Sequence, residues 1–414
     1  MKKPELLLPA GSLETLYTAV HYGADAVYIG GEAFSLRAAA KNFSPSEMQE
    51  GICHAHANGC KVYVTANILA HNADLADAAD YFSFLGGIGP DAILISDPGL
   101  FRIARRICPQ INLHISTQAN NTNAETFLFW HALGAKRVVC GRELSLSEIA
   151  QIRAEIPDEL EIEAFVHGAM CISYSGRCLM SSYFTGRDAN RGACTHPCRW
   201  QYSVVEESRP GEVMPVYENG RGTYIFSSKD LCMIDHIPDL VYAGIDSLKV
   251  EGRMKSALYM AVIARAYRRA IDEWFDDPAA YEAHLAAYRR EVKQCVHRDY
   301  CTGFFYGKPD EASQLYDRKA YADEYTYLGS VEEILPDGRI RLTQKNKFSV
   351  GEQIEILRPD GGNIAAAVTG ITDADHHAQE SAPHACQVIY AALRTVPESA
   401  FGAVQVRDVL RRKN

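Results

Sequence analysis

Eight short apolar runs, separated by stretches with helical periodicity, constrain the fold of this chain more than any other feature. Each run is rich in Val, Ile and Leu without regular alternation, as in "DAVYIGG" and "KVYVTAN", which is typical of parallel strands covered on both faces. The runs begin at Glu5, Asp25, Lys61, Asp91, Ile111, Arg137, Glu161 and Asp246. Eight strands that alternate with helices predict an α/β fold of the (β/α)8 TIM-barrel type, with a doubly wound open sheet as the alternative.

The segments between the runs carry helix start signals and one long interruption. Ser12 precedes a helical pattern and is expected as its N-cap, and a further helix is expected from Ser256 to Phe275. From 168 to about 244 the gap is too long for one loop and one helix, which predicts an insertion after strand seven. In a barrel, this position lies on the C-terminal face, where active sites occur. Within the insertion, segments 201–207 and 223–231 are expected to pair as a small sheet.

The pattern changes in the last quarter of the chain. Residues 1–300 are expected to form the barrel domain with its Cys-rich insertion, and residues 301–324 a linker. From 325 to 414, short alternating runs are separated by turns such as "LPDGR" and "RPDGGN". These signals predict a small antiparallel β-barrel domain.

Composition excludes several classes of protein. The N-terminal apolar run is only three leucines long, and no run of eighteen apolar residues follows, so we expect a cytoplasmic protein without a membrane partner. The formal net charge of −10 argues against non-specific coating of nucleic acid, and no DNA partner is expected. It does not exclude a local basic groove, because binding follows the local field.

A cluster of cysteines is the strongest chemical signal. The stretch "HGAMCISYSGRCLMSSYFTGRDANRGACTHPCRW" holds Cys171, Cys178, Cys194 and Cys198, separated by six, fifteen and three residues. In a reducing compartment such a cluster points to metal or catalysis rather than disulfides. Zinc knuckles bring two close Cys pairs, whereas a [4Fe–4S] cluster accepts ligands from separate loops, so the spacing predicts a metal site with iron–sulfur ahead of zinc. The nearby arginines could offset cluster charge; they are Arg177, Arg187, Arg191 and Arg199.

A nucleophilic cysteine is the competing hypothesis. His167 and Cys171 are four residues apart and would share a face if their segment were helical, as a Cys–His pair requires. The chain has no G-x-S-x-G and no H-E-x-x-H motif, so the sequence does not support a serine hydrolase or a zincin.

Polar residues at the carboxyl ends of the predicted strands are the remaining site candidates, because these ends face the active site of a barrel. Lys249, Glu251 and Arg253 alternate in "KVEGR" and share one face while that strand stays extended. The other candidates are Asn67, Asp97, His114, Gln118, Arg142, Glu143 and His167, of which about half are expected only to cap helices or pair at the rim. His297 and Arg298 are expected either to close over the mouth or to form a structural turn.

An RNA substrate needs phosphate partners and stacking surfaces. Within the insertion, Tyr183, Phe184 and Trp200 lie close in sequence to the arginines named above. The face of the Ser256 helix that carries Arg265, Arg268 and Arg269 could add a basic edge, but a solvated helix face is the favoured interpretation.

Long blocks of the sequence resemble the peptidase U32 family. They include "EAFVHGAMCISYSGRCLMSSY", "RGACTHPCRW", "PAGSLETLYTAVHYGADAVYIGG", "STQANNTN", "SLKVEGRMKS" and "HRDYCTGFFYGKP", and the resemblance extends over essentially the whole chain. Within the family the chain is most similar to bacterial tRNA-hydroxylation proteins, which support formation of 5-hydroxyuridine at the wobble position. Collagenase-like members are less similar.

The resemblance implies hydroxylation of a tRNA base as the leading function, together with a cofactor and a partner, and two other functions remain as alternatives. Several hydroxylation members carry a four-cysteine [4Fe–4S] cluster, which maps here onto Cys171, Cys178 and Cys194, with Cys198 or Cys232 as the fourth ligand. Prephenate is implied as a co-substrate and tRNA as the partner. The alternatives are a collagenase-like peptidase, in which Cys171 or a metal-bound water attacks a peptide substrate, and a non-enzymatic RNA-binding accessory protein.

Overall fold

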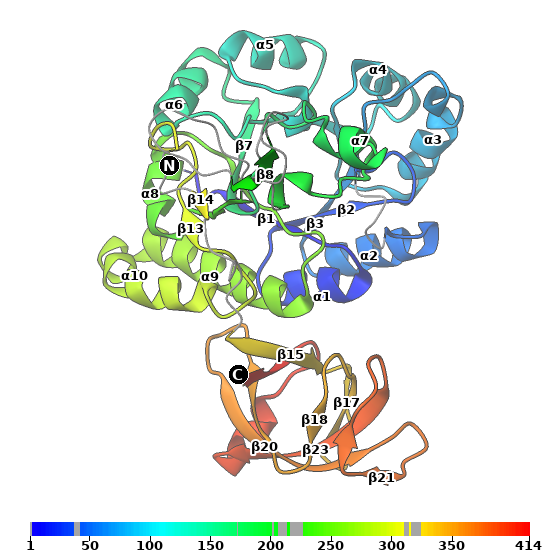
Figure 1. Ribbon diagram of the computed structural model, residues 1–414, viewed down its shortest axis with the longest axis vertical. Helices are drawn as coiled ribbons and strands as arrows, with labels where there is room; N and C mark the ends of the chain where they lie inside the picture. The colour runs from blue at the N-terminus through cyan, green and yellow to red at the C-terminus, as the bar shows by residue number, and fades with distance from the viewer. Residues whose placement is uncertain are drawn as a thin grey trace.

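The computed structural model describes residues 2–36, 42–171, 173–200, 203–205, 213–215, 227–309, 314–315 and 324–414. Most of these residues belong to an α/β barrel, and the last ninety form a separate β-domain below it in Figure 1. No helix within the described ranges is long and apolar enough to cross a bilayer.

The barrel contains the eight strands that the apolar runs predicted. They are β1 (Glu5–Pro9), β2 (Ala26–Gly30), β3 (Lys61–Ala66), β4 (Ala92–Ile95), β5 (Asn112–Ile115), β6 (Arg137–Val139), β7 (Glu161–Gly168) and β12 (Ser247–Val250). All pair in parallel in this order, and β12 pairs with both β7 and β1. This double pairing closes the barrel, so the (β/α)8 prediction is confirmed and the open-sheet alternative is wrong.

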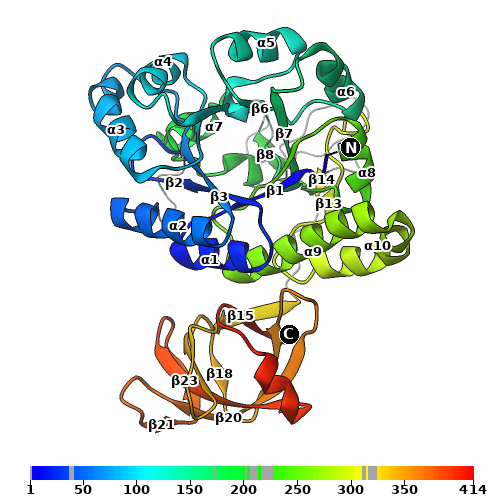
Figure 2. The same cartoon turned by 180° about the vertical axis from the view of Figure 1, so that it is seen from behind.

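Helices surround the strands on the outside, as Figures 1 and 2 show from opposite sides. They are α1 (Leu13–His21), α2 (Pro45–Ala57), α3 (Ala78–Ile88), α4 (Pro98–Ile107), α5 (Ala124–Ala132), α6 (Leu146–Glu155), α8 (Ile237–Tyr242), α9 (Ala257–Asp276) and α10 (Pro278–Val292). Ser12 caps α1 as predicted, and Ser256, expected as the first residue of its helix, caps α9; each accepts the N–H of the third residue of its helix. The strands are therefore buried on both faces, which explains their uninterrupted apolar sequences.

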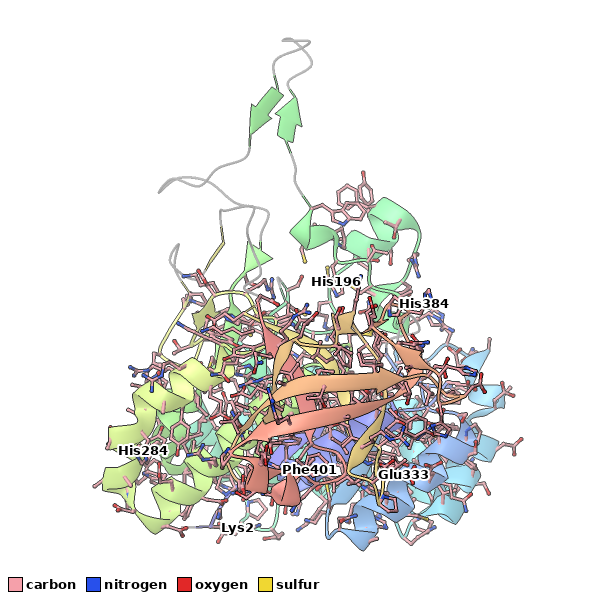
Figure 3. All side chains as sticks on the ribbon, turned by 90° about the horizontal axis from the view of Figure 1, so that it is seen from below. Lys2, His196, His284, Glu333, His384 and Phe401 are labelled. Carbon is pink, nitrogen blue, oxygen red and sulfur yellow. The ribbon has the colours of Figure 1, made fainter. Side chains whose placement is uncertain are left out.

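The insertion after β7 carries a short helix, α7 (Met180–Thr185), the 3-10 turns η3 (Ala189–Arg191) and η4 (Pro197–Arg199), and the strands β8 (Ser203–Val205) and β9 (Val213–Pro215). The small sheet expected between 201–207 and 223–231 is wrong. Instead β8 pairs with β9, and the two stand clear of the barrel in Figure 3. The second segment contributes β10 (Ser227–Ser228), which pairs with β14 (Gln314–Leu315), and β11 (Asp230–Cys232), which extends the barrel sheet beside β7. The last two residues of β7 offer free edge positions, and β11 pairs with them. This pairing with the barrel outweighs the expected pairing of the second segment with residues 201–207.

The C-terminal domain is an antiparallel β-sheet around its own apolar core, which confirms the prediction for this region. Its path is β15 (Tyr325–Ser330), β24 (Val409–Lys413), β19 (Gln353–Leu357), β20 (Ile364–Thr372), β23 (Val388–Val396), β17 (Arg339–Thr343) and β16 (Glu333–Ile334). The core includes Leu328, Ile340 and Phe348, which have no exposed surface.

Hydrogen bonds tie this β-domain to α1 and α9 of the barrel. The hydroxyl of Tyr22 donates to the carbonyl of Leu357 at 2.5 Å and accepts the N–H of Val409 at 3.0 Å. Arg265 donates from Nη1 to the carbonyl of Arg358 at 2.7 Å. Because these groups are largely buried, the two domains share a specific interface rather than a flexible linker alone.

Candidate active site at the C-terminal mouth of the barrel

A cavity of about 350 Å³ lies where the barrel strands end and the insertion covers them. The barrel contributes Asn67, Ser116, Gln118, Arg142, Lys249, Glu251, Arg253 and Lys255 to its wall. The insertion contributes Cys171, Cys178, Cys194, His196 and Cys198; His196 is labelled on the green ribbon in Figure 3. The site therefore forms at the carboxyl ends of the strands, the face on which barrel enzymes place their catalytic groups.

All four clustered cysteines line this one cavity. Cys171 follows the end of β7, Cys178 precedes α7, and Cys194 and Cys198 flank the start of η4. The backbone N–H of His196 donates to Sγ of Cys194 over 3.4 Å. This contact fixes the turn between Cys194 and η4.

One glycine allows the cysteine loop to approach the barrel. Gly176 has a φ of +75°, and a Cβ there would come 2.8 Å from Oε1 of Gln118. The loop before Cys178 therefore packs on the turn after β5 only because residue 176 lacks a side chain.

The spacing of the thiols tests which metal group they fit. Within the described part of the chain, no three cysteine sulfurs come within 4.8 Å of one another, since the single group of that kind is Asp373, Asp375 and His377 in the β-domain. Four thiolates on one tetrahedral zinc ion lie about 3.8 Å apart, given Zn–S bonds of about 2.3 Å. Among the described residues, the thiols are therefore not gathered at the spacing of a single tetrahedral ion.

Lys249 is the deepest basic group of the cavity. It is buried, its Nζ lies 2.6 Å from Oε1 of Glu163 on β7, and it lies 4.6 Å from the ring centre of Tyr28. Burial lowers the pKa of Lys249, and the carboxylate of Glu163 opposes that effect.

Glu251 and Arg253 lie just beyond the end of β12. Arg253 donates from Nη1 to Oγ of Ser35 at 2.8 Å and to Oγ1 of Thr65 at 3.2 Å. Its guanidinium packs on the backbone of Gly30, where a Cβ would come 2.0 Å from Nη1. Glu251 has its Oε2 3.4 Å from the hydroxyl of Tyr28. The three charges of "KVEGR" line the same cavity, although the strand itself ends at Val250.

Arg142 connects the barrel to the start of the insertion. Its Nη1 donates to the carbonyl of Ala169 at 2.9 Å, and its guanidinium carbon lies 4.0 Å from the ring centre of Phe165. Nη2 lies 3.9 Å from Oε2 of Glu251. Four cationic side chains and one carboxylate thus line the cavity, in a chain whose overall charge is strongly negative.

Two family profiles match this chain. The profile described as peptidase family U32 matches residues 11–315, and the profile described as peptidase family U32 C-terminal domain matches residues 323–401. The chain belongs to peptidase family U32.

Relatives with names that refer to RNA are similar to this U32 protein over most of its length. tRNA hydroxylation protein P1 of Bacillus subtilis (strain 168) is 40% identical over 389 residues, which cover 94% of this chain and 91% of the relative. tRNA hydroxylation protein P of Escherichia coli (strain K12) is 39% identical over 423 residues, covering 92% of each chain. The 23S rRNA 5-hydroxycytidine C2501 synthase of E. coli (strain K12) is 37% identical over 268 residues, covering 65% of this chain and 39% of that one.

His167 lies away from the cavity of this U32 protein. It belongs to β7, is 1% exposed, and its Nδ1 lies 3.3 Å from the hydroxyl of Tyr267 on α9. Burial lowers its pKa to about 3. The helical face that His167 and Cys171 would have to share does not form, because His167 belongs to strand β7 and Cys171 follows that strand; only Cys171 lines the cavity.

His114 and Glu143 also do not reach the cavity wall. His114 lies inside the barrel with its ring 4.9 Å from that of Tyr63, and burial lowers its pKa well below the usual value. Burial raises the pKa of Glu143, which lies outside the lining. Asp97 caps α4 by accepting the N–H of Leu100 at 2.9 Å. These residues fit the expectation that about half of the rim candidates have structural roles, whereas Asn67 and Gln118 line the cavity.

Cys232 lies apart from the other four cysteines. It pairs with His167 between β11 and β7, and its Sγ lies 3.9 Å from the hydroxyl of Tyr267. Burial raises the pKa of its thiol to about 12. Of the two cysteines considered for the fourth position, Cys198 lines the cavity and Cys232 does not.

His297 and Arg298 form a structural turn and do not close over the mouth. Arg298 donates to Oδ1 of Asp230 from Nε at 3.0 Å and from Nη2 at 2.6 Å, and the ring of His297 stacks on Tyr300 at 4.6 Å. Both are buried. Their contacts fix the β11–β13 edge, where β13 spans Tyr300–Cys301.

Several of the arginines considered as RNA or cluster partners are already engaged. Arg191 forms two hydrogen bonds of 2.7 Å with the carboxylate of Asp74, which fastens the insertion to the loop after β3. Arg177 donates from Nε to Oδ1 of Asn120 at 3.2 Å. On α9, Arg265 is buried against Glu291, and Arg268 pairs with Asp25 and Asp272, so that helix presents a paired face rather than a basic edge.

Sequence reasoning missed a buried ionic chain below the cavity. Glu163, which contacts Lys249, also lies 3.0 Å from Nη1 of Arg137, and the same nitrogen lies 2.6 Å from Oε1 of Glu5. The signal that could have found it is the alternation of Glu161 and Glu163 in a strand otherwise made of core residues. A charged residue at an inward position of a buried strand requires a partner.

Proposed function

We propose that this U32 protein is an RNA hydroxylation enzyme that supports 5-hydroxyuridine formation at the wobble position of tRNA. In this proposal Cys171, Cys178, Cys194 and Cys198 hold a [4Fe–4S] cluster. The observation that carries the proposal is that all four cysteines line the same cavity as Lys249 and Arg253. Its similarity to relatives named tRNA hydroxylation proteins, over more than nine tenths of the chain, supports RNA as the substrate.

The chemistry gives a reason for this combination of groups. Replacing the C5–H bond of uracil by C5–OH is a two-electron oxidation that requires an external oxidant and an oxygen donor. A cluster held by Cys171, Cys178, Cys194 and Cys198 would supply one-electron transfer for such a reaction. The chain's own residues bind and orient the substrate: Arg142, Arg253 and Lys255 offer N–H donors to phosphate or carboxylate oxygens. We include prephenate as the co-substrate that the family resemblance implies, with these same cations as partners for its carboxylates.

Two features of the site favour a cluster over a single zinc ion. The thiols are not gathered to the spacing of a tetrahedral ion. The wall also carries several cations, which offset the net negative charge of a four-thiolate cluster.

A peptidase is the competing function, and the site offers it less support. The neighbour that a Cys171 nucleophile would need, His167, lies between β7 and α9 with a pKa of about 3. A histidine held neutral and away from the cavity cannot take the proton of that thiol.

The experiment is anaerobic purification followed by an optical spectrum and assays of iron and sulfide, together with mass spectrometry of tRNA nucleosides from cells that depend on this protein. We expect a brown protein with about four irons per chain, and loss of both colour and 5-hydroxyuridine in Cys178→Ala. The matched control is Cys386→Ala, an exposed cysteine of the β-domain, which should change neither.

Three results would contradict the proposal in different ways. One zinc ion per colourless chain would remove the cluster. Peptidase activity that survives Cys178→Ala but not Cys171→Ala would establish the nucleophile instead. Unchanged hydroxylation in the Cys178→Ala strain, with tRNA still bound, would leave an RNA-binding accessory role.

A further inference from the structure

The insertion exposes a group of large apolar side chains beside the cavity. The side chain of Tyr183 is 84% exposed, that of Leu179 67% and that of Trp200 44%. Aromatic side chains of this size contribute most when buried, so several exposed together mark a binding surface rather than a solvated face. We call Tyr183, Phe184 and Trp200 the aromatic surface.

The rings of the aromatic surface are not stacked face to face with each other. The Tyr183 and Phe184 rings lie 5.2 Å apart at 82°, and the Phe184 and Trp200 rings lie 6.3 Å apart at 52°. They belong to α7 and the end of η4, the two elements that carry or flank Cys178, Cys194 and Cys198. In Figure 3 the green ribbon of α7 lies at the outer edge of the molecule, above the labelled His196. Three exposed rings therefore lie close together within the insertion that carries the cysteines.

The charge next to this surface suits a polyanion. Even with Lys249 paired to Glu163, the cavity wall presents Arg142, Arg253 and Lys255 against the single carboxylate of Glu251. Arg187, which follows α7 directly, is exposed. The whole chain carries a formal charge of −10, so this local excess of cations is a property of the site and not of the protein.

The size of the cavity limits what can enter it. Its volume of about 350 Å³ is at the small end of ligand sites. Such a volume suits one nucleotide and not a base pair.

We propose that the protein binds an RNA loop with unstacked bases, one base entering the cavity and a neighbouring base stacking on the aromatic surface. This inference rests on the proposed function, because it takes the substrate to be RNA. The inference adds the mode of RNA recognition, which is through splayed single-stranded bases rather than through a helix. Base-paired RNA hides the faces that Tyr183 and Trp200 would stack on.

The test measures binding of two fluorescent RNAs to the anaerobically purified full-length protein. One is a 17-nucleotide hairpin with a seven-base loop that includes uridine, and the other is a blunt duplex of equal length without a loop. We expect the hairpin to bind more tightly than the duplex, and Tyr183→Ala and Trp200→Ala each to weaken hairpin binding about tenfold. Tyr183→Phe should bind like the wild type, because it keeps the ring face.

Tyr242→Ala is the matched control. Tyr242 is 66% exposed and is the last residue of α8. Because α8 ends just before the amino end of β12, Tyr242 lies at the opposite end of the barrel from the cavity. Its substitution should not change RNA binding. Equal affinity for hairpin and duplex, or wild-type hairpin binding by the Tyr183→Ala Trp200→Ala double variant, would overturn the inference. If Cys178→Ala abolishes 5-hydroxyuridine while that double variant binds normally, the inference fails and the proposed function stands. If the double variant loses hairpin binding and Cys178→Ala still forms 5-hydroxyuridine, the inference stands and the cysteine-dependent function fails.

Discussion

The ammonium of Lys249 and the carboxylate of Glu163 lie 2.6 Å apart inside the barrel, with 85 residues between them in sequence. Glu163 is completely buried, and its second oxygen lies 3.0 Å from Arg137. Burial alone would lower the pKa of Arg137, but the carboxylates of Glu5 and Glu163 raise it well above its ordinary value. The guanidinium of Arg137 therefore keeps its protons. The chain of charges therefore positions Lys249 and does not conduct protons along the barrel.

Removing the charge of Glu163 should destabilise the protein. Glu163→Gln leaves Lys249 and Arg137 buried without full compensation, and we expect the free energy of unfolding to fall by about 3 kcal/mol, as when one partner of a buried pair is lost. Urea denaturation checks this value. Glu155→Gln, on the exposed side of α6, should stay within about 0.5 kcal/mol of wild type. Adding Lys249→Met to Glu163→Gln should restore part of the loss, and a purely additive double variant would show that the pair is not coupled.

Gly30 should be essential for the position of Arg253. In Gly30→Ala the new methyl would come 2.0 Å from Nη1 of Arg253 and 2.3 Å from Oγ of Ser35, so the guanidinium must move. We expect 5-hydroxyuridine formation to fall about 100-fold, the order associated with a displacement of about 1 Å at a site, while circular dichroism stays unchanged. Gly87→Ala, with nothing within 4 Å of its Cβ, is the control. Full activity in Gly30→Ala would mean that Arg253 does not act in the reaction.

The contact between Arg191 and Asp74 should hold the insertion on the barrel. We expect Arg191→Ala to increase limited proteolysis within the insertion roughly threefold, the range of a partly exposed ion pair. Arg187→Ala, an exposed arginine in the same insertion, should leave the rate unchanged. If both variants are cut at the wild-type rate, other contacts of the insertion are sufficient.

The same contact predicts acid sensitivity. Hydrogen bonds from Arg191 lower the pKa of Asp74 to about 2, from an ordinary value of 3.8. The folded state then favours the ionised form, so the stabilisation is present above about pH 4 and is lost as the pH falls toward 2. Proteolysis of the wild-type insertion by an acid-active protease should accelerate across this window, and Asp74→Asn should remove the pH dependence.

The burial of His167 predicts a second loss of stability on acidification, which begins at a higher pH than the loss at Asp74. Its pKa is lowered by burial from 6.5 to about 3, so the unfolded chain binds a proton that the folded chain does not. Stability is therefore lost as the pH falls from about 6.5 toward 3, by about 2 kcal/mol at pH 5. Denaturation at pH 7.5 and pH 5 should show this loss in wild type and a smaller one in His167→Phe, with His71→Gln as the surface control. An identical loss in His167→Phe would assign the effect to other groups, such as His114.

Local sequence was enough to predict the strands, the Ser12 cap and the insertion that carries the four cysteines to the mouth of the barrel. The apolar runs span only a few residues each, and Ser12 caps α1 through Thr15, three residues away. The four cysteines lie within 28 residues, so one compact insertion brings them together without any distant partner. Such features depend on neighbours in the chain, which a sequence displays directly.

Tertiary structure alone decided which residues face one another across the barrel. Arg253 reaches Ser35 across 217 intervening residues, and Cys232 joins His167 and not the cysteine cluster, because β11 pairs with β7. His167 looked like a site residue by position, but the β7–β12 register shifts between Phe165 and His167, and the His167 side chain lies against Tyr267 on α9. Strand order, register and the closure between β12 and β1 fix these relations, and they depend on the energy of the whole packed barrel rather than on any one segment.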